Sequence, residues 1–297
     1  MLFACRKGPI ADHVFADYDG DGKRDLVVFR PESSTWLVRT SSSQFTRSWS
    51  RVWGDDSDIP VPGDYDGDGK ADLAVFRRST GTWAVLTSSS EFSLSWSQHW
   101  GNKGDMPVPG DYDGDGLADL AVFRPSTGWW YVKTSSSYFT ANWSRAWGDS
   151  GDIPVPGDYD GDRKTDLAVF RPSTGAWYVK TSSSGYAESW SHPWGNDGDI
   201  PVPGDYDGDG HADLVVFRPS TGTWYGKTSS SGFTATWSHA WGDAGDIPVR
   251  GDYEGDRKCD LALFRPSDGH WYISTSSSGY AKGWSVQWGD REDTPAY

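Results

Sequence analysis

The chain has 297 residues, a formal net charge of −15 and two cysteines. This acidity excludes the basic footprint that nucleic-acid binding requires, and no apolar window of 18 residues is present that could span a membrane. With 36 glycines, 19 tryptophans and 14 tyrosines, the composition favours many short strands joined by turns over long helices.

The first residues, MLFACRKGPIADH, contain no apolar segment long enough for a secretory signal. We therefore expect either that a signal has been removed or that the chain is part of a longer protein. Two cysteines are too few for a disulfide framework.

The sequence repeats itself every 47 residues from residue 17 onward, with no insertion or deletion between copies. The clearest marker is an aspartate that opens each copy: Asp17, Asp64, Asp111, Asp158, Asp205 and Asp252. A fixed period of this length indicates a solenoid, an array or a propeller.

Three series of tryptophans follow the same period and account for all but Trp129. The Trp36 series is Trp36, Trp83, Trp130, Trp177, Trp224 and Trp271. The Trp49 series is Trp49, Trp96, Trp143, Trp190, Trp237 and Trp284. The Trp53 series is Trp53, Trp100, Trp147, Trp194, Trp241 and Trp288. We expect the Trp36 series above all to fill space between repeats.

Each repeat reads as four short strands separated by turn residues. In the fifth repeat the predicted strands are PVPGDYD (201–207), DLVVFRP (213–219), TWYGKTS (223–229) and FTATWSHAW (233–241). The second is apolar on both faces, whereas the fourth alternates and places Phe233, Trp237 and Trp241 on one side. Four-stranded antiparallel units repeated around a ring form a β-propeller.

Six repeats fill residues 17–297, so we predict an all-β, six-bladed propeller as a single domain, preceded by an N-terminal segment at 1–16 that carries a ring-closing strand. Seven blades are the alternative if the chain is a fragment. The C-terminal DTPAY has the same phase as the innermost strands, so the sequence leaves open which segment closes the ring. Cys5 and Cys259 lie near this seam, and we favour two unpaired thiols over a bridge.

A nine-residue acidic segment occurs in every repeat and has the pattern DxDxDGxxD in four of them. We call it the acidic loop and number its positions 1–9. Positions 1, 3, 5 and 9 offer carboxylates and position 7 a backbone carbonyl, which are the hard oxygen ligands that calcium prefers. A strand follows instead of a helix and no glutamate stands at position 12, so the loop is not an EF-hand.

The predicted calcium ligands are, loop by loop, Asp17, Asp19, Asp21, Lys23 and Asp25; Asp64, Asp66, Asp68, Lys70 and Asp72; Asp111, Asp113, Asp115, Leu117 and Asp119; Asp158, Asp160, Asp162, Lys164 and Asp166; Asp205, Asp207, Asp209, His211 and Asp213; and Asp252, Glu254, Asp256, Lys258 and Asp260.

Up to six calcium ions are therefore expected, and two of the sites should be the weakest. The glycine at position 6 is replaced by Arg163 in the fourth loop and by Arg257 in the sixth, where Glu254 also replaces an aspartate. A side chain disfavours the left-handed backbone expected there, and a cation beside the ion opposes binding.

The motif GDYDGDGKADLAVF resembles the FG-GAP or VCBS-type repeat of calcium-binding propellers, which occurs in integrin α-subunit heads, secreted bacterial proteins and fungal lectins of the Psathyrella velutina type. The resemblance extends over nearly the whole chain and implies that the loop aspartates bind calcium. The GAP tripeptide is replaced by FRP or FRR, which argues against integrin-like ligand chemistry. A secreted or cell-surface location is implied by the same resemblance.

Aromatic rings beside polar side chains are suited to binding sugars. We expect ligand sites in clefts between blades, lined by the Trp53 series and the aspartates that follow it: Trp53, Asp55, Trp100, Trp147, Asp149, Trp194, Trp241, Asp243, Trp288 and Asp290. The repeated arginines (Arg30, Arg77, Arg124, Arg171, Arg218 and Arg265) are expected to anchor the Asp-rich crossings between blades.

No repeat is lengthened, the histidines are scattered and no GxSxG or HExxH motif occurs, so we expect a binding protein and not an enzyme. The leading hypothesis is a calcium-stabilised, multivalent carbohydrate-binding or adhesion propeller, with glycans or glycoproteins as partners and a monomeric state. The alternative is a protein-interaction or structural module of a larger secreted protein. A polysaccharide lyase on the same scaffold is the less favoured third.

Overall fold

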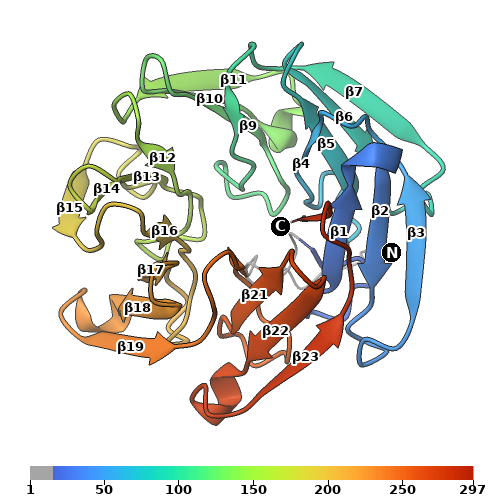
Figure 1. The fold of residues 1–297 in the computed structure, drawn as a ribbon. Helices are drawn as coiled ribbons and strands as arrows, with labels where there is room; N and C mark the ends of the chain where they lie inside the picture. The colour runs from blue at the N-terminus through green and yellow to red at the C-terminus, as the bar shows by residue number, and fades with distance from the viewer. Residues whose placement is uncertain (1–15, 297) are drawn as a thin grey trace, which may run out of the picture.

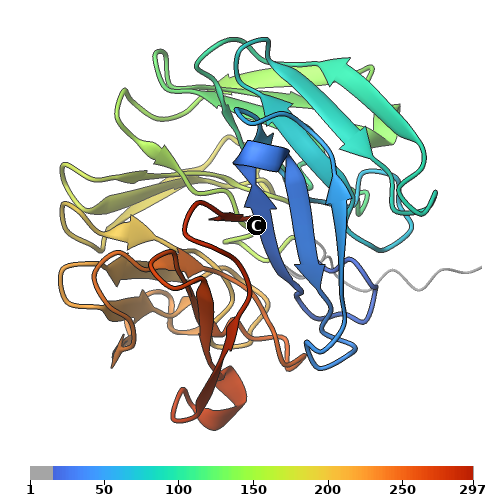
Figure 2. The same ribbon diagram turned by 45° about the vertical axis from the view of Figure 1, so that its right-hand side comes forward.

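The computed structural model describes residues 16–296, and its strands form six four-stranded antiparallel sheets. Figures 1 and 2 show these sheets as blades arranged around a central axis, so the predicted six-bladed β-propeller is confirmed. Cys5 and nearly all of the N-terminal segment at 1–16 lie outside the described residues. Within residues 16–296, no helix is long and apolar enough to cross a membrane.

The blades follow one another in chain order, and within each blade the strands are named from the innermost outward. Blade one contains β24 (Thr294–Pro295), β1 (Leu26–Arg30), β2 (Thr35–Arg39) and β3 (Ser48–Val52); blade two β4 (Ile59–Pro60), β5 (Leu73–Arg77), β6 (Thr82–Leu86) and β7 (Ser95–His99); and blade three β8 (Met106–Pro107), β9 (Leu120–Arg124), β10 (Trp129–Lys133) and β11 (Asn142–Ala146).

Blade four contains β12 (Ile153–Pro154), β13 (Leu167–Arg171), β14 (Ala176–Lys180) and β15 (Ser189–Pro193); blade five β16 (Ile200–Pro201), β17 (Leu214–Arg218), β18 (Thr223–Lys227) and β19 (Thr236–Ala240); and blade six β20 (Ile247–Val249), β21 (Leu261–Arg265), β22 (His270–Ser274) and β23 (Gly283–Gln287).

The C-terminal segment completes blade one. Strand β24 pairs antiparallel with β1, with Pro295 opposite Val28 and Thr294 opposite Phe29. The last blade is thereby tied to the first through a strand that belongs to blade one in space and to the sixth repeat in sequence.

All four strands predicted for blade five are shorter in the structure, and the first and the last differ most from the prediction. The innermost strand of blade five is Ile200–Pro201 and not 201–207, because Pro203 has no N–H to donate and Asp205 already begins the acidic loop. The outermost strand is Thr236–Ala240 and not 233–241, because Phe233 lies in a turn at φ 61°. Within β19 the predicted alternation is confirmed, since only Trp237 and His239 are partly buried.

The core lies between the blades. The first four residues of each second strand are buried on both faces, as predicted. All six indoles of the Trp36 series are at most 1% exposed, and each donates its N–H to the carbonyl of the Trp53-series residue in the same blade at 2.7–3.1 Å. The predicted structural role of this series is confirmed.

Replacing a Trp36-series residue should cost more stability than replacing a Trp53-series residue in the same blade. Trp177→Ala removes a fully buried ring and leaves the carbonyl of Trp194 without its donor, so we expect a loss of about 3–5 kcal/mol in the free energy of unfolding. Trp194→Ala is the matched control, since this indole is only partly buried. Equal losses in urea unfolding would contradict the assignment of the core.

Candidate metal and ligand sites

Each acidic loop is folded by hydrogen bonds from backbone N–H groups to its own carboxylates. In loop 1 the two oxygens of Asp17 accept from the amides of Gly20 (2.7 Å) and Gly22 (2.8 Å). Asp25 at position 9 accepts from the amides of Ser41 (2.7 Å) and Tyr18 (2.8 Å). These bonds offset part of the repulsion between the neighbouring carboxylates.

The serine-rich turn after the third strand closes over the same loop. Ser41 Oγ donates to Asp21 at 2.8 Å and Ser42 Oγ donates to Asp19 at 2.5 Å. The corresponding serines of the other blades repeat at least one of these contacts. The acidic loops and the serine-rich turns therefore share one face of the ring.

Neighbouring acidic loops are joined in a closed circle. The amide at position 8 of each loop donates to the backbone carbonyl of the position-1 aspartate in the preceding loop. The six bonds measure 2.6–2.8 Å and join Ala71 to Asp17, Ala118 to Asp64, Thr165 to Asp111, Ala212 to Asp158, Cys259 to Asp205 and Arg24 to Asp252. The last bond crosses the seam between blades six and one, so the circle has no open end.

Five loops gather three carboxylate oxygens within 4.8 Å of one another, an arrangement that could hold a metal ion. The sets are Asp17, Asp19 and Asp25; Asp64, Asp66 and Asp72; Asp111, Asp113 and Asp115; Asp158, Asp160 and Asp166; and Asp205, Asp207 and Asp213. All of them belong to the predicted ligands. Within the described residues the sixth loop forms no such set, and its position 3 carries Glu254, which accepts from the amide and hydroxyl of Ser277.

Burial raises the pKa of the aspartate at position 9 of every loop and of the aspartate at position 1 in five of them. Desolvation is the largest cause for Asp25, whose pKa rises to about 7, and for Asp17, whose pKa rises to about 6. Hydrogen bonds from backbone amides oppose this rise in both residues. The same directions recur in the other loops for Asp72, Asp119, Asp166, Asp213 and Asp260, and for Asp64, Asp111, Asp158 and Asp205. A bound cation would relieve this cost of ionisation.

The two arginines at position 6 adopt the left-handed backbone that the sequence analysis expected. Arg163 and Arg257 both have φ 69°, in the place where Gly22 has φ 84°. Their amides still donate to the position-1 aspartates, at 2.8 and 2.7 Å. The loop geometry is thus kept at the expense of backbone strain, and the lower metal affinity of these two loops stays a prediction.

The residues predicted to bind a ligand lie on the opposite face. Four indoles of the Trp53 series donate to a carbonyl of the next blade at 3.2–3.4 Å, and Trp288 donates across the seam to Leu26 and Leu37. Trp241 is the exception, since its buried indole nitrogen has no partner among the described residues. Asp55, Asp149, Asp243 and Asp290 form ion pairs with arginines. Ligand binding by these residues stays a prediction.

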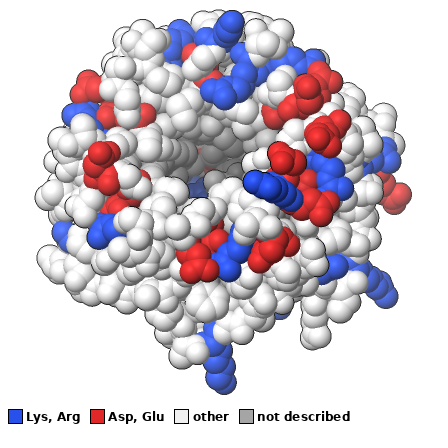
Figure 3. All heavy atoms as spheres, in the orientation of Figure 1, with Lys and Arg blue, Asp and Glu red and all other residues white. Residues whose placement is uncertain are grey.

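The repeated arginines anchor the crossings between blades, as predicted. Each guanidinium pairs with a buried aspartate of the crossing at 2.7–3.1 Å, in the pairs Arg30–Asp293, Arg77–Asp58, Arg124–Asp105, Arg171–Asp152, Arg218–Asp199 and Arg265–Asp246. Figure 3 shows basic and acidic side chains next to one another around the central hollow.

The Trp49 series forms an aromatic pair at every junction between blades. Each of these tryptophans packs on the aromatic residue of the next blade's serine-rich turn, with ring centroids 4.9–5.9 Å apart: Trp49–Phe92, Trp96–Phe139, Trp143–Tyr186, Trp190–Phe233, Trp237–Tyr280 and Trp284–Phe45. The turn aromatic has a positive φ of 57–62° in all six, so this packing holds bulky residues in a strained backbone.

At four junctions a further side chain lies on this pair. Arg51 donates to the carbonyl of Phe92, Arg145 lies 6.0 Å from the Trp143 ring, and His192 and His239 lie 5.3 and 6.0 Å from the partner rings. At the seam, the residue equivalent to Arg51 is Val286, whose side chain is too short to cover the aromatic pair. In the sequence this difference is visible as one apolar residue, Val286, in a series that is otherwise polar.

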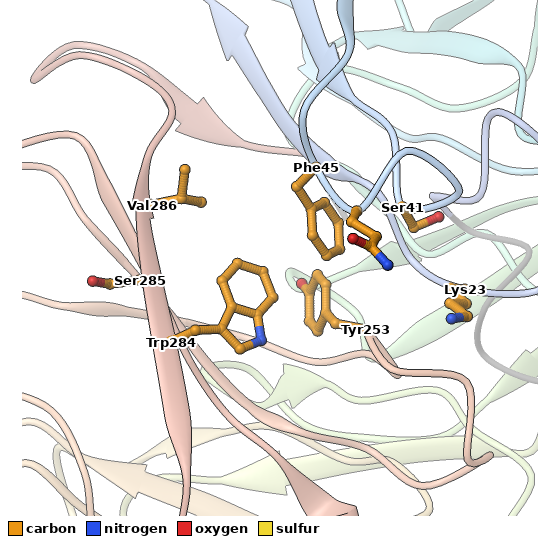
Figure 4. Close-up of a pocket in the computed structure, with 8 residues that line it drawn as sticks. Lys23, Ser41, Phe45, Tyr253, Trp284, Ser285 and Val286 are labelled. Atoms are coloured by element: carbon orange, nitrogen blue, oxygen red, sulfur yellow. The ribbon is translucent and has the colours of Figure 1, made fainter.

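A pocket of about 430 Å³ opens at the seam, where Val286 leaves the aromatic pair uncovered. Figure 4 shows Trp284, Phe45 and Tyr253 around this space, with Val286 and Ser285 on one side and Ser41 and Lys23 on the other. The Tyr253 hydroxyl is buried without a partner among residues 16–296, whereas the equivalent hydroxyl of Tyr206 donates to Val202 at 3.1 Å. Gln44 and the serines supply a polar rim.

Comparison with family models identifies FG-GAP-like repeats at residues 17–75, 64–122, 111–169 and 158–216. No curated protein sequence matches the chain.

Several solved structures share the fold at low sequence identity. A lectin from Agrocybe aegerita, described as recognising non-reducing terminal N-acetylglucosamine, is 14% identical with a TM-score of 0.59, over 94% of this chain and 77% of the lectin. A streptogramin B lyase is 10% identical with a TM-score of 0.53, over 94% and 87%. BBS1N, solved in complex with ARL6DN, is 14% identical with a TM-score of 0.53, over 90% and 81%. At these identities the similarity establishes the fold alone.

Replacing Arg163 by glycine should stabilise the protein in the presence of EDTA. The substitution removes the strain at φ 69° while keeping the amide that bonds Asp158, so we expect a gain of about 1 kcal/mol in urea unfolding. Gly69→Arg introduces the same strain into loop 2, where φ is 85°, and should produce a loss of similar size. An unchanged midpoint in both variants would show that the strain is absent.

The metal-free protein should become more stable as the pH falls from 8 to 5. The folded-state pKa of Asp25 is raised to about 7 from 3.8, so the stabilising contribution of its protonated form is lost as the pH rises through 7. In EDTA, thermal unfolding should therefore occur at a higher temperature at pH 5 than at pH 8. A higher melting temperature at pH 8 would contradict the raised pKa values.

Proposed function

Because the chain belongs to the FG-GAP-like repeat family, we propose that it is a calcium-stabilised propeller that binds carbohydrate at several sites outside the cell. The proposal joins two separate roles. The acidic loops hold calcium and stabilise the ring, while aromatic sites between blades receive sugar rings. We propose that the protein acts by binding and carries out no reaction of its own.

The calcium role is supported by the chemistry of the acidic loops. Their ligands would be the carboxylates at positions 1, 3, 5 and 9 and the carbonyl at position 7, all hard oxygens. Six divalent ions would change the formal net charge from −15 to −3 and so relieve repulsion within the ring. Extracellular modules work at calcium affinities of about 10⁻⁴–10⁻³ M, and an extracellular setting would supply the ion at that level.

The observation that carries the carbohydrate role is the seam pocket. Its floor of Trp284, Phe45 and Tyr253 offers apolar faces, and Ser41 and Gln44 add hydrogen-bonding groups. A pyranose has one apolar face and a rim of hydroxyls, and the buried hydroxyl of Tyr253 offers a further partner. The terminal N-acetylglucosamine recognised by the Agrocybe aegerita lectin makes terminal sugar residues the first ligands to test.

A protein-binding role is the second candidate, supported by BBS1N, which has the same fold and was solved in complex with ARL6DN. The seam pocket argues for the sugar role instead, because it is a concave site of the size range found for small ligands.

A glycan array probed with and without EDTA tests the proposed function. We expect binding to terminal sugar residues in calcium, loss of that binding in EDTA, and a large reduction in Val286→Arg. This substitution places in the seam pocket the residue that Arg51 provides at the junction of blades one and two. Arg51→Val, which should open that junction, is the matched control and should retain or increase binding. A silent array for the wild-type protein would contradict the carbohydrate role.

A further inference from the structure

Trp129 is the tryptophan that belongs to none of the three series. It begins β10 and is 39% exposed, whereas the equivalent residues in the other blades are Thr35, Thr82, Ala176, Thr223 and His270. Trp129 is neither part of the buried core nor among the residues that line the seam pocket. The other five repeats have no tryptophan at this position, so the exposed indole of Trp129 is a candidate binding residue.

The surroundings of Trp129 form a platform with polar groups at one side. Its ring stacks on Tyr131 with centroids 6.3 Å apart, because the two residues are two positions apart on the same face of β10. The Arg124 guanidinium lies over the Tyr131 ring at 4.4 Å, and its Nη1 donates to the Tyr131 hydroxyl at 3.0 Å. Tyr131 is thus fixed from one side, and Trp129 extends the aromatic surface outward.

The charge around this platform differs from that in most other blades. Arg30, Arg77, Arg171 and Arg265 each pair with two aspartates. Among residues 16–296, Arg124 pairs with Asp105 as its one aspartate. The second place is taken by Asn102, whose side-chain oxygen accepts from Arg124 Nη2 at 2.7 Å once the amide is oriented to satisfy its hydrogen bonds. At Arg124 a neutral amide therefore takes the place of the second carboxylate.

We propose that Trp129, Tyr131, Arg124 and Asn102 form a second carbohydrate site, specific to blade three, in which a neutral pyranose stacks on the Trp129 indole. The Tyr131 hydroxyl accepts from Arg124, so its own hydrogen is available to a sugar oxygen. This inference rests on the proposed carbohydrate function and adds a site on the face of the ring opposite the acidic loops, away from the seam pocket.

A sugar fits this platform better than a protein does. A stable protein interface buries about 800 Å² on each partner. The other exposed large apolar residues, Val52, Leu94, Tyr138 and Ile200, lie on other blades or, for Tyr138, in the serine-rich turn on the acidic-loop face. A single exposed indole with adjacent hydrogen-bonding groups matches one sugar ring.

The test uses Trp129→Thr in the Val286→Arg background, so that the seam pocket is closed. Threonine is the residue of blades one, two and five at this position, and the melting temperature should therefore not change. We expect the affinity for terminal N-acetylglucosamine, measured by calorimetry, to fall at least about tenfold relative to Val286→Arg alone. In spectra of the indole N–H groups of Val286→Arg, the Trp129 signal should shift on titration with the sugar.

Blade five offers a gain-of-binding control. Tyr225 already lies under Arg218 at 4.4 Å, and the Asn196 oxygen accepts from Arg218 Nη2 at 2.7 Å, so only the indole is missing. Thr223→Trp should restore sugar binding to the Trp129→Thr, Val286→Arg protein.

Three results would overturn the inference, and they differ in what else they overturn. Equal sugar affinity with and without Trp129, while the wild-type array is positive, would remove this site and leave the proposed function intact. A wild-type protein that binds no glycan would remove both. Binding of a glycoprotein that depends on Trp129 and survives enzymatic removal of the glycans would assign the platform to a protein partner instead.

Discussion

The closed circle of hydrogen bonds between acidic loops is the constraint on which the rest of the ring depends. Every loop gives an amide to the loop before it and a carbonyl to the loop after it, and the bond from Arg24 to Asp252 joins the ends. The same loops bind the serine-rich turns through position 9, as Asp25 does with Ser41. Those turns carry the aromatic residues that fill the junctions between blades. The geometry of each acidic loop therefore affects the packing between blades through a few hydrogen bonds.

This arrangement also explains why the acidic segments are tolerated. The buried carboxylates satisfy backbone amides that would otherwise lack partners, which favours the folded loop. Their raised pKa values show that burial still opposes ionisation. The loops therefore gather several carboxylates whose ionisation burial opposes, and such sites are well suited to binding a cation. In the two loops with arginine at position 6, this charge is combined with backbone strain.

The 47-residue period was enough to predict the fold and the role of the Trp36 series, because each depends on features shared by all repeats. The lengths of the strands were predicted less well, since Pro203 and Phe233 act through backbone geometry that a strand-like sequence does not reveal. The candidate ligand sites depend on departures from the repeat. Val286 and Trp129 were both visible in the sequence, but only the structure relates the first to a pocket and the second to Tyr131 and Arg124.

Hydrogen exchange at the six amides of position 8 tests the central claim most directly, because each of these amides makes one bond of the circle. If the circle is a single cooperative element, the amides of Ala71, Ala118, Thr165, Ala212, Cys259 and Arg24 should share one high protection factor in calcium and lose protection together in EDTA. Loss of protection in one or two loops while the others stay protected would show that the loops are independent and would contradict the account.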